Sequence, residues 1–501
     1  MTRLPLAYGS RLAVVDMGEN SVVLAPPPPV EAIADVAAAV RDALRFPLAG
    51  QPLEALVPRN ARATIVVEPP ALPIPGSPSD PRRTAIAATM LELERAGAPS
   101  ERQTLLVAGG LARRSGHREL ELLVPPEVAR RFRGRVQVHD VESDDLVEIT
   151  DGDRTVRVNP ALAETDVVVP VTAAETVLHG GAGALLAASD RRSLRAANAY
   201  SLLETSASGG WKRALELERA LARRVPLIGV SLTLNTPALG GVLHGYPHDR
   251  ETVDRIAGFP LRGLFGLLPG PVRIGVLRHL PSEFSSVAVF AGPPSVAHSE
   301  ALLRGVDAKA AQLDEPLDAI CIGIPHTTPN LPREAPNPLA AAYLGLGLAL
   351  RLWRDAFPVV DGGTAILLSR FKRRFPHPTQ QPYRALFQAL RSRGAREPAD
   401  LVDEEDMAGS DSRAIDEYRG GRACHPLLPF AQWDACQPAI QRLGTVMVAG
   451  CRDSAVARQL GFVPTHGVGA AMAMTHGWAD RPPRIGFLLS PPYFPLRVGA
   501  G

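Results

Sequence analysis

Short apolar runs alternate along the chain with longer segments of helical periodicity. Buried strands are indicated by "ATIVVEPP" (63–70) and "QTLLVAGG" (103–110), each of which ends in proline or glycine. Between them, "DPRRTAIAATMLELERAGA" (80–98) has helical spacing, with Asp80 as its expected N-cap and Pro81 at its first position. Strands that alternate in this way with helices predict parallel α/β layers.

The same alternation continues to the C-terminus. Further strand-like runs are "TDVVVPV" (165–171), "PLDAICIGIP" (316–325), "GGTAILLS" (362–369), "GTVMVAG" (444–450) and "PRIGFLLSPP" (483–492). A chain of 501 residues is too long for one ordinary core. We therefore expect two α/β domains with an interdomain cleft: an N-terminal domain over 1–262, a linker over 263–273 and a C-terminal domain over 274–501.

Charge and cysteine content exclude several classes of function. The formal net charge is +2, so no basic field is present that would hold nucleic acid or an anionic membrane. The four cysteines form no C-x-x-C pair and are interpreted as reduced thiols of a cytoplasmic protein. The longest apolar stretch, "NPLAAAYLGLGLALRLW" (337–353), is interrupted by Arg351 and suits a buried helix better than a membrane span.

Several segments resemble a known family. The opening "LAYGSRLAVVDMGEN" (6–20) continues into a proline-bounded helix and the "IVVE" strand (65–68), and "LLVAGGLARRSGHREL" (105–120) and "VNPALAETDVVVPV" (158–171) follow. Together with "VMVAGCRDSAVARQLGFVPTHGVGAAMAMTHG" (446–477), these segments are similar to the nickel-pincer-dependent lactate racemases. The resemblance implies two α/β domains and a cleft that holds the active site.

The resemblance also implies a particular chemistry. The family binds nickel in a pincer nucleotide that is attached to a lysine, and histidines act as metal ligand and as acid and base. A hydride leaves the α-carbon of a 2-hydroxy acid for the cofactor and returns to the opposite face. By this resemblance the chain is a racemase or epimerase that acts on a small 2-hydroxy acid.

This sequence departs from the family at the positions that carry its chemistry. Glu175 and Gly181 match the family's "EPHFFAGFSGG.K" motif. The other functional positions hold different residues: the family's acid falls on Pro69, its substrate-binding arginine on Leu72, its two catalytic histidines on Ala112 and Val177, and its anchoring lysine on Ala187. The cofactor therefore stays unknown, because a lysine-linked pincer cannot form at an alanine.

Two glycine turns are candidates for cofactor binding. In "ETVLHGGAGALLAA" (175–188), His179 precedes Gly181 and Gly183. His179 lies two positions from the expected histidine and either replaces it or is a plain turn histidine. In "VAGGLARRSG" (107–116), Gly109 and Gly110 form either a phosphate-binding loop or an ordinary strand-to-helix turn.

Two C-terminal loops and one basic segment are further candidates. "PHTTPNLPREAPNP" (325–338) places His326 and Asn337 directly after a strand, and "RACHPLLPFAQW" (422–433) contains His425. Ligands in open α/β sheets bind beyond strand carboxyl ends, so these residues are expected to meet Glu175 and His179 in the cleft; the alternative is a pair of rigid loops with hydrogen-bonded histidines. "SRFKRRFPHPTQQPYR" (369–384) is either a lip for an anionic ligand or a solvated loop.

Three hypotheses for function stay open. The first is a racemase or epimerase, with the nickel chemistry in doubt. The second is an enzyme of altered mechanism, in which His326, His425 and His179 supply the acid and base beside Glu175. The third is a catalytically silent relative that binds a small anion. The expected partner is a small anionic molecule, and neither nucleic acid nor a membrane is expected to bind. The sequence predicts no metal ligands and leaves the oligomeric state open.

Overall fold

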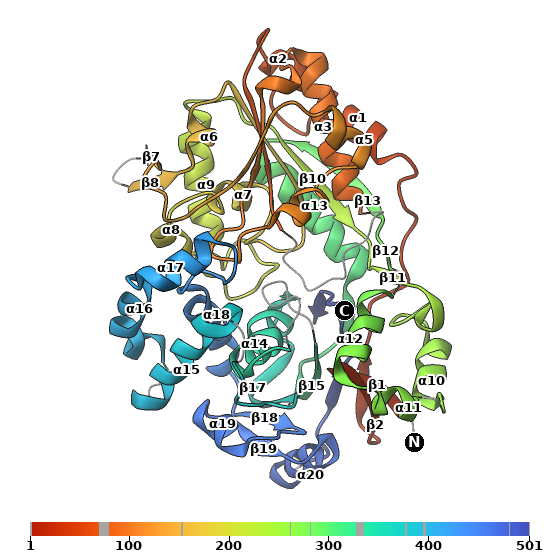
Figure 1. The fold of residues 1–501 in the computed structure, drawn as a ribbon. Coiled ribbons are helices and arrows are strands. Elements are labelled where there is room, and N and C mark those ends of the chain that lie inside the picture. Colours follow the sequence, from red (N-terminus) through yellow and green to blue (C-terminus); the bar gives the residue numbers. More distant parts are fainter. Residues whose placement is uncertain are drawn as a thin grey trace.

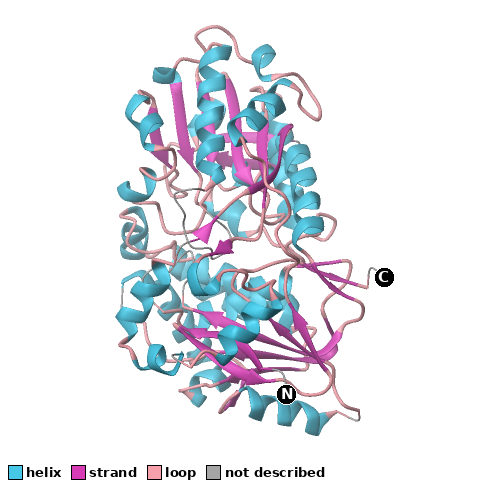
Figure 2. Ribbon diagram, turned by 90° about the vertical axis from the view of Figure 1, so that its right-hand side faces the viewer, coloured by secondary structure: helices cyan, strands magenta, loops and turns pink. Residues whose placement is uncertain are grey.

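The structure is a computed structural model that shows two large sheets covered by helices (Figure 1). It describes residues 3–69, 80–151, 154–260, 262–280, 282–326, 335–375, 378–393, 397–479 and 481–499. The two sheets lie one above the other, with the helices packed around them (Figure 2). This arrangement confirms the predicted α/β fold class.

The first sheet has six strands in the order β13-β10-β9-β4-β5-β6. Its members are β4 (Ala63–Val67), β5 (Gln103–Val107), β6 (Arg135–Val138), β9 (Val167–Ala173), β10 (Gly229–Leu234) and β13 (Ser286–Gly292). All neighbours are parallel except β10 and β13. The central strands are buried on both faces, which explains their nearly continuous apolar sequence.

Helices cover both faces of this sheet. The main ones are α1 (Val36–Arg45), α3 (Pro81–Ala96), α9 (Gly209–Ala222) and α13 (Pro294–Lys309). Ile65 of β4 belongs to the core that α1 and α3 cover, whereas the next residue, Val66, packs with α9. Asp80 accepts a hydrogen bond from the Arg82 amide at 3.0 Å, and Pro81 opens α3, as the sequence predicts.

The second sheet has eight strands around the path β19-β18-β17-β15-β1-β2. Its members are β1 (Arg3–Gly9), β2 (Arg11–Asp16), β3 (Ser21–Leu24), β15 (Leu317–Pro325), β17 (Val359–Leu368), β18 (Thr445–Ala449), β19 (Val463–Thr465) and β20 (Ile485–Leu488). β20 pairs with both β15 and β3. The strands β1, β15, β17 and β18 run parallel, so their carboxyl ends share one edge.

Two helical layers enclose the second sheet. They contain α10 (Arg250–Gly258), α14 (Pro338–Ala342), α15 (Gln381–Arg393), α18 (Leu428–Ile440) and α20 (Val468–Trp478). Ile320 and Ile322 of β15 pack in the core with Phe387 and Trp433, while the intervening Cys321 packs on the opposite face with Met472. This alternation buries both faces of the strand.

Shorter elements complete the fold. The short helices are α2 (Leu53–Leu56), α4 (His117–Leu120), α5 (Pro126–Arg131), α6 (Pro160–Ala163), α7 (Ala182–Leu186), α8 (Arg191–Arg195), α11 (Arg262–Leu267), α12 (Gly270–Arg278), α16 (Val402–Gly409), α17 (Ser412–Arg419) and α19 (Ser454–Gln459). The short strands form the hairpin β7 (Val147–Asp151)–β8 (Arg154–Val158), the pair β11 (Ala238–Leu239)–β12 (Ser282–Glu283) and the sheet β14 (Ala311–Leu313)–β21 (Leu496–Val498)–β16 (Trp353–Arg354).

Within the described parts of the chain, no helix combines the length and the apolar character needed to cross a membrane.

Strand pairing crosses the domain boundary that the sequence suggests. β1, β2 and β3 lie at the N-terminus, yet they complete the second sheet. β13 follows the expected linker, yet it pairs with β10 in the first sheet. The expected linker over 263–273 falls within α11 and α12. Local periodicity predicts strands but not their partners, so this exchange of strands between the halves has no local signal.

Each sheet has a point where the strand order reverses. In the first sheet, β5 and β6 extend to one side of β4, and β9 and β10 extend to the other. In the second sheet, β17 and β18 lie on one side of β15, and β20 pairs on its other side. Open α/β sheets bind ligands beyond the carboxyl ends of strands at such points.

Candidate functional site

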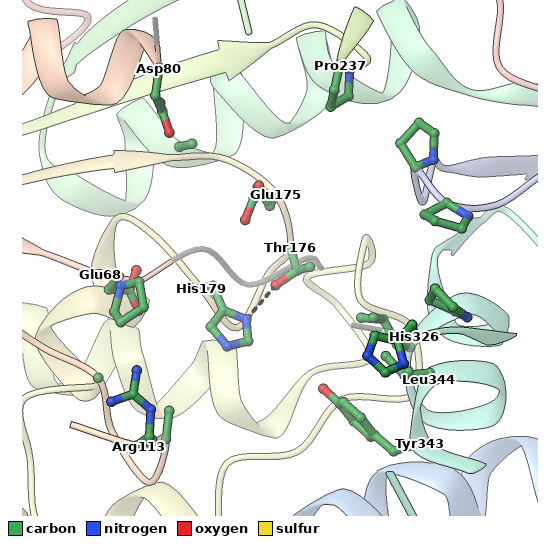
Figure 3. A pocket seen from close by; sticks show the side chains of 18 of the residues that line it. Glu68, Asp80, Arg113, Glu175, Thr176, His179, Pro237, His326, Tyr343 and Leu344 are labelled. Carbon is green, nitrogen blue, oxygen red and sulfur yellow. Dashed lines mark hydrogen bonds between the residues drawn. The ribbon is translucent and has the colours of Figure 1, made fainter. Parts of the chain in front are cut away.

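One large cavity lies at the carboxyl ends of both sheets. Its volume is about 2,010 Å³, which exceeds the roughly 300–1,000 Å³ of an ordinary ligand pocket. Glu68 follows β4 and Glu175 follows β9, while His326 follows β15 and Pro491 follows β20, and all four line this cavity. Both strand-order reversals therefore face the same space, and Figure 3 shows Glu68, Glu175 and His326 around it.

Glu68 is a half-buried acid at the end of β4. Its Oε2 accepts a hydrogen bond from the Gly180 amide at 2.5 Å. Burial raises the pKa of Glu68 to about 8; the Gly180 hydrogen bond opposes this rise, and the charge of Glu175 adds to it. At neutral pH, Glu68 therefore holds a proton that it can donate.

His179 lies one residue before this glycine on the turn after β9. Its Nδ1 is 3.0 Å from Oγ of Thr176, and its ring lines the cavity (Figure 3). Burial, and then the charge of Arg351, lower the pKa of His179 to about 4. The ring is therefore neutral at pH 7. In the tautomer whose Nδ1–H donates to Thr176, Nε2 carries the lone pair of a base.

A second histidine, His298, supports the Thr176 turn from behind. Nε2 of His298 on α13 lies 3.0 Å from the backbone oxygen of Thr176, and its ring contacts Trp211 with centroids 5.8 Å apart. His298 is fully buried, and burial lowers its pKa to about 4. Thr176 is thus held by two histidines, and this arrangement fixes the orientation of the His179 ring.

Charged side chains surround Glu175 in the cavity wall. Nη1 of Arg82 is 4.0 Å from Oε1 of Glu175, while Nη2 of Arg82 binds Asp80 at 2.5 Å. Lys309 ends α13, and burial lowers the pKa of its ammonium group, although the negative charge of Glu175 raises it in part. The result is a network of two carboxylates and two cations beside the acid–base residues, in which Glu175 is buried and Asp80, Arg82 and Lys309 are half-buried.

Arg351 places a buried positive charge in the cavity wall. The side chain is 2% exposed, and its pKa is lowered to about 10, chiefly by burial. Nη1 donates to the Gly347 carbonyl at 3.2 Å and Nη2 to Oδ1 of Asn198 at 3.2 Å, and Nη2 also donates to the Ala199 carbonyl. Nε has no hydrogen-bond partner within the described structure, and none of these acceptors is charged.

A distorted helix carries Arg351 to the cavity. The residues after α14 form a π-helix, η3 (Tyr343–Leu348), and then a 3-10 turn, η4 (Ala349–Arg351). The predicted buried helix is therefore present, but its hydrogen bonding changes along its length. Tyr343 and Leu344 of the π-helix line the cavity (Figure 3). π-Helical turns are rare and occur frequently at functional sites.

Among the expected C-terminal residues, only His326 reaches this space. His326 is 8% exposed and lies directly after β15 in the cavity wall (Figure 3). Asn337 is the N-cap of α14, where its Oδ1 accepts from the Ala340 amide at 3.0 Å. It is not among the described residues that line the cavity. The threonines and asparagine of "HTTPN" after His326 lie outside the described residues.

His425 lies outside this lining as well. Its Nε2 is 2.9 Å from Oε1 of Glu142, and its Nδ1 accepts from the Leu427 amide at 3.2 Å. The ring packs edge-on against Tyr418, with centroids 5.1 Å apart, and is completely buried. The structure thus separates His425 from Glu175, His179 and His326. Both of its ring nitrogens are used in hydrogen bonds within the protein, so the role of His425 is structural.

Three of the four predicted glycines line the cavity, and the fourth supports the turn behind it. Gly109, Gly110 and Gly183 line the cavity, whereas Gly181 does not. Gly181 has φ +53°, and a Cβ there would lie 2.4 Å from the Cβ of His298. Its amide donates to Oγ1 of Thr172 at 2.9 Å. Gly181 is therefore required by close packing behind the turn rather than by contact with a ligand.

The residues of the cavity do not fit a lysine-anchored nickel pincer. Ala112 and Ala187 line the wall at the expected histidine and lysine positions, and Val177 is fully buried in the core. None of the described lining residues is a lysine. In the described chain, no group of three or more histidine, cysteine or acidic side chains is placed to hold a metal ion.

Two residues of the site were missed in the sequence. Glu68 stands directly after the strand "ATIVV", one position before the proline that occupies the family's acid position. In the sequence alone, Arg351 is only an interruption of an apolar run. A lone arginine in such a run is itself a signal, because buried arginine is rare without a charged partner.

Comparisons with known proteins identify the N-terminal domain and one solved structure of the same fold. Residues 8–183 match the family model described as the lactate racemase N-terminal domain. The lactate racemase apoprotein from Thermoanaerobacterium thermosaccharolyticum has the same fold, with a TM-score of 0.61 and 13% identity over 99% of this chain and 100% of that chain. A Thermotoga maritima protein aligns over 92% of this chain and 98% of its own, with 11% identity and a TM-score of 0.46. No curated protein matches the sequence. Residues 8–183 thus contain a lactate racemase N-terminal domain, and the chain as a whole shares the fold of the lactate racemase apoprotein.

Proposed function

We propose that the protein is a racemase or epimerase that acts on a small 2-hydroxy acid by proton transfer between its own side chains. One observation carries this proposal: Glu68 and His179 line the same cavity with pKa values displaced in opposite directions, to about 8 and about 4. Such a pair provides a protonated acid and a neutral base at the same pH. The match of residues 8–183 to the lactate racemase N-terminal domain supports the reaction class.

Arg351 supplies the binding group for the substrate. Its guanidinium has only neutral hydrogen-bond partners in the described structure, and its charge already acts on His179. A substrate carboxylate at this guanidinium would neutralise a buried charge and place the adjacent carbon near the base. The cavity has room for 2-hydroxy acids larger than lactate.

The proton transfers balance within the site. Nε2 of His179 removes the α-proton, and the electron pair spreads into the carboxylate, where the charge of Arg351 stabilises it. The Oε–H group of Glu68 then donates its proton to the opposite face of the same carbon. Glu68 ends ionised and His179 protonated, and one proton passed from His179 to Glu68 restores the starting state. Inversion requires that His179 and Glu68 lie on opposite faces of this carbon.

Chiral analysis of a panel of enantiopure 2-hydroxy acids tests this proposal. We expect the wild type to invert at least one of them, and Glu68→Gln and His179→Asn each to lower kcat by about 10²–10⁴-fold. Glu94→Gln and His244→Asn change exposed residues and serve as matched controls. Full activity in either site variant, or no inversion of any acid by the wild type, would contradict the proposal.

A further inference from the structure

A group of six cations lies at the carboxyl edge of the second sheet. Arg11 follows β1, and Arg370, Lys372 and Arg374 follow β17. Arg452 follows β18, and Arg273 lies on α12. Because β1, β17 and β18 run parallel with β15, these segments emerge on one side of the sheet. We call these six residues the cation cluster; it lies outside the acid–base site.

Hydrogen bonds hold the loops of the cation cluster together. The Arg452 amide donates to the Arg370 carbonyl at 2.9 Å, and the Tyr8 hydroxyl donates to the Gly450 carbonyl at 2.7 Å. The guanidinium of Arg370 lies over the Tyr8 ring, 6.0 Å from its centroid. Gly450 has φ +73°, and a Cβ there would lie 2.7 Å from the Tyr8 oxygen. Three separate loops are therefore fixed in one arrangement.

Phe371 fixes the same region from within the core. It has φ +24°, a region that residues with a side chain rarely adopt. Its ring is 2% exposed and packs against Phe462, with centroids 6.2 Å apart. Local strain of this kind persists only where the surrounding structure holds it, and it is common at binding sites. The loop that carries Arg370 and Lys372 is thus preorganised.

Within the described residues, the positive charges of the cation cluster have no acidic partners. Arg273 is 5% exposed, and it donates to Oγ of Ser10 at 3.2 Å, to the Gly266 carbonyl at 3.3 Å and to the Leu268 carbonyl. Nε of Arg11 and Nε of Arg370 are buried without a hydrogen-bond partner. Across the described chain, none of the six cations forms an ion pair with a carboxylate. Buried donors and uncompensated charge of one sign favour a bound anion.

The cations also repel one another. Burial and the charges of Arg11 and Arg370 lower the pKa of Arg273. The charge of Arg370, then burial, then the charges of Arg374 and Arg452 lower the pKa of Lys372. An anion at this place would relieve the repulsion. Several guanidinium groups and one ammonium group match the charge and the many acceptor oxygens of a phosphate dianion.

We propose that the cation cluster binds a phosphate group, either free or as the phosphate of a small monoester. The inner cations Arg11, Arg273 and Arg370 are half-buried or buried, so a compact dianion reaches them more easily than a polymer backbone. Ser10 and Arg11 also line the large cavity, so an organic group attached to the phosphate can extend into it. A net charge of only +2 argues against a nucleic-acid surface.

Isothermal titration of the full chain with inorganic phosphate and with glycerol 3-phosphate tests this site. Glycerol serves as the uncharged probe, and a single-stranded oligonucleotide tests the polymer alternative. We expect both phosphate probes to bind and glycerol not to bind. Tighter binding of the ester would assign the site to a monoester, and equal binding would assign it to free phosphate. Failure of both phosphate probes at millimolar concentration, or tighter binding of the oligonucleotide, would overturn the proposal.

Substitutions in the cation cluster test whether phosphate binds there. Arg370→Gln and Lys372→Gln should each weaken phosphate binding by about tenfold or more. Arg59→Gln, an exposed arginine near the first sheet, should leave it unchanged. Because Arg370 contributes to loop packing, each variant is first checked by its thermal unfolding; Lys372 is exposed and keeps the test valid if Arg370→Gln unfolds. Unchanged phosphate affinity in a folded Lys372→Gln variant would refute binding at the cation cluster.

Discussion

The Gly180 amide donates a 2.5 Å hydrogen bond to Oε2 of Glu68. This bond joins the end of β4 to the turn after β9, two positions that lie 112 residues apart in the sequence. It places an acid with a raised pKa directly beside the residue that follows His179. The acid–base pair is therefore built by the reversal of strand order in the first sheet, not by a local motif.

Glu68→Gln should change how stability depends on pH. The pKa of Glu68 is raised from 4.5 to about 8, so the folded chain keeps a proton that the unfolded chain releases within this range. Rising pH therefore favours unfolding of the wild type through this residue, by at most about 1.4 kcal/mol per pH unit. The glutamine variant cannot ionise, so we expect it to gain stability relative to the wild type between pH 4.5 and about 8. Urea unfolding at several pH values measures this, with Glu94→Gln as control; a difference that is constant with pH would contradict the raised pKa.

Arg351→Met should weaken ligand binding and stability together. Loss of the guanidinium removes the proposed carboxylate contact, so Kd for a 2-hydroxy acid should rise by about tenfold or more. The Gly347 and Ala199 carbonyls would lose their donor, and we expect the free energy of unfolding to fall by about 1–3 kcal/mol. Titration calorimetry and urea unfolding measure the two effects. Arg354→Gln is the matched control, and unchanged affinity in Arg351→Met would exclude Arg351 as the carboxylate site.

The purified protein should carry no lysine-linked nucleotide. Ala187 occupies the position of the anchoring lysine, and no lysine is present among the described lining residues. We expect the intact mass to equal the 53.3 kDa of the polypeptide and nickel to be lost on dialysis. A mass increase that maps to a lysine, or stoichiometric nickel after dialysis, would show that the pincer binds by another route.

His425→Ala should lower stability without affecting the cavity. The substitution removes the His425 hydrogen bond from Glu142, which keeps Arg191 as a partner, and it removes the ring that packs against Tyr418, so a loss of about 1–3 kcal/mol is expected. Ligand affinity should stay as in the wild type, because His425 does not line the cavity. His244→Asn changes an exposed histidine and is the control for both measurements. A loss of ligand binding in a stable His425→Ala protein would contradict this prediction and would show that His425 contributes to the binding site.

The sequence predicts the local elements well and their assembly poorly. The runs at β4, β5, β9, β15, β17, β18 and β20 have patterns that determine a buried strand by themselves, and Asp80 and Pro81 mark the start of α3. The pairing of β1 with β15 depends on contacts between residues more than 300 positions apart, such as Tyr8 and Ile324. Periodicity contains no record of such contacts.

The site shows the same division. Glu175, His179 and His326 follow predicted strands or turns, and the structure places all three in one cavity. Glu68 and Arg351 acquire their properties from burial and from distant neighbours, so their roles are not visible in local sequence. His425 shows the converse: its proline-flanked motif suggests a site, yet its ring nitrogens are used by Glu142 and Leu427.

The most direct test of the account is the origin of the hydrogen in the inverted product. An enantiopure 2-hydroxy acid that the enzyme inverts is incubated with it in D₂O, and the α-position of the product is examined by NMR and mass spectrometry. Proton transfer through His179 and Glu68 predicts deuterium at the α-carbon of the inverted product, because both groups exchange with solvent. Inverted product that keeps its original α-hydrogen would show direct hydride return and would contradict the proposed roles of Glu68 and His179.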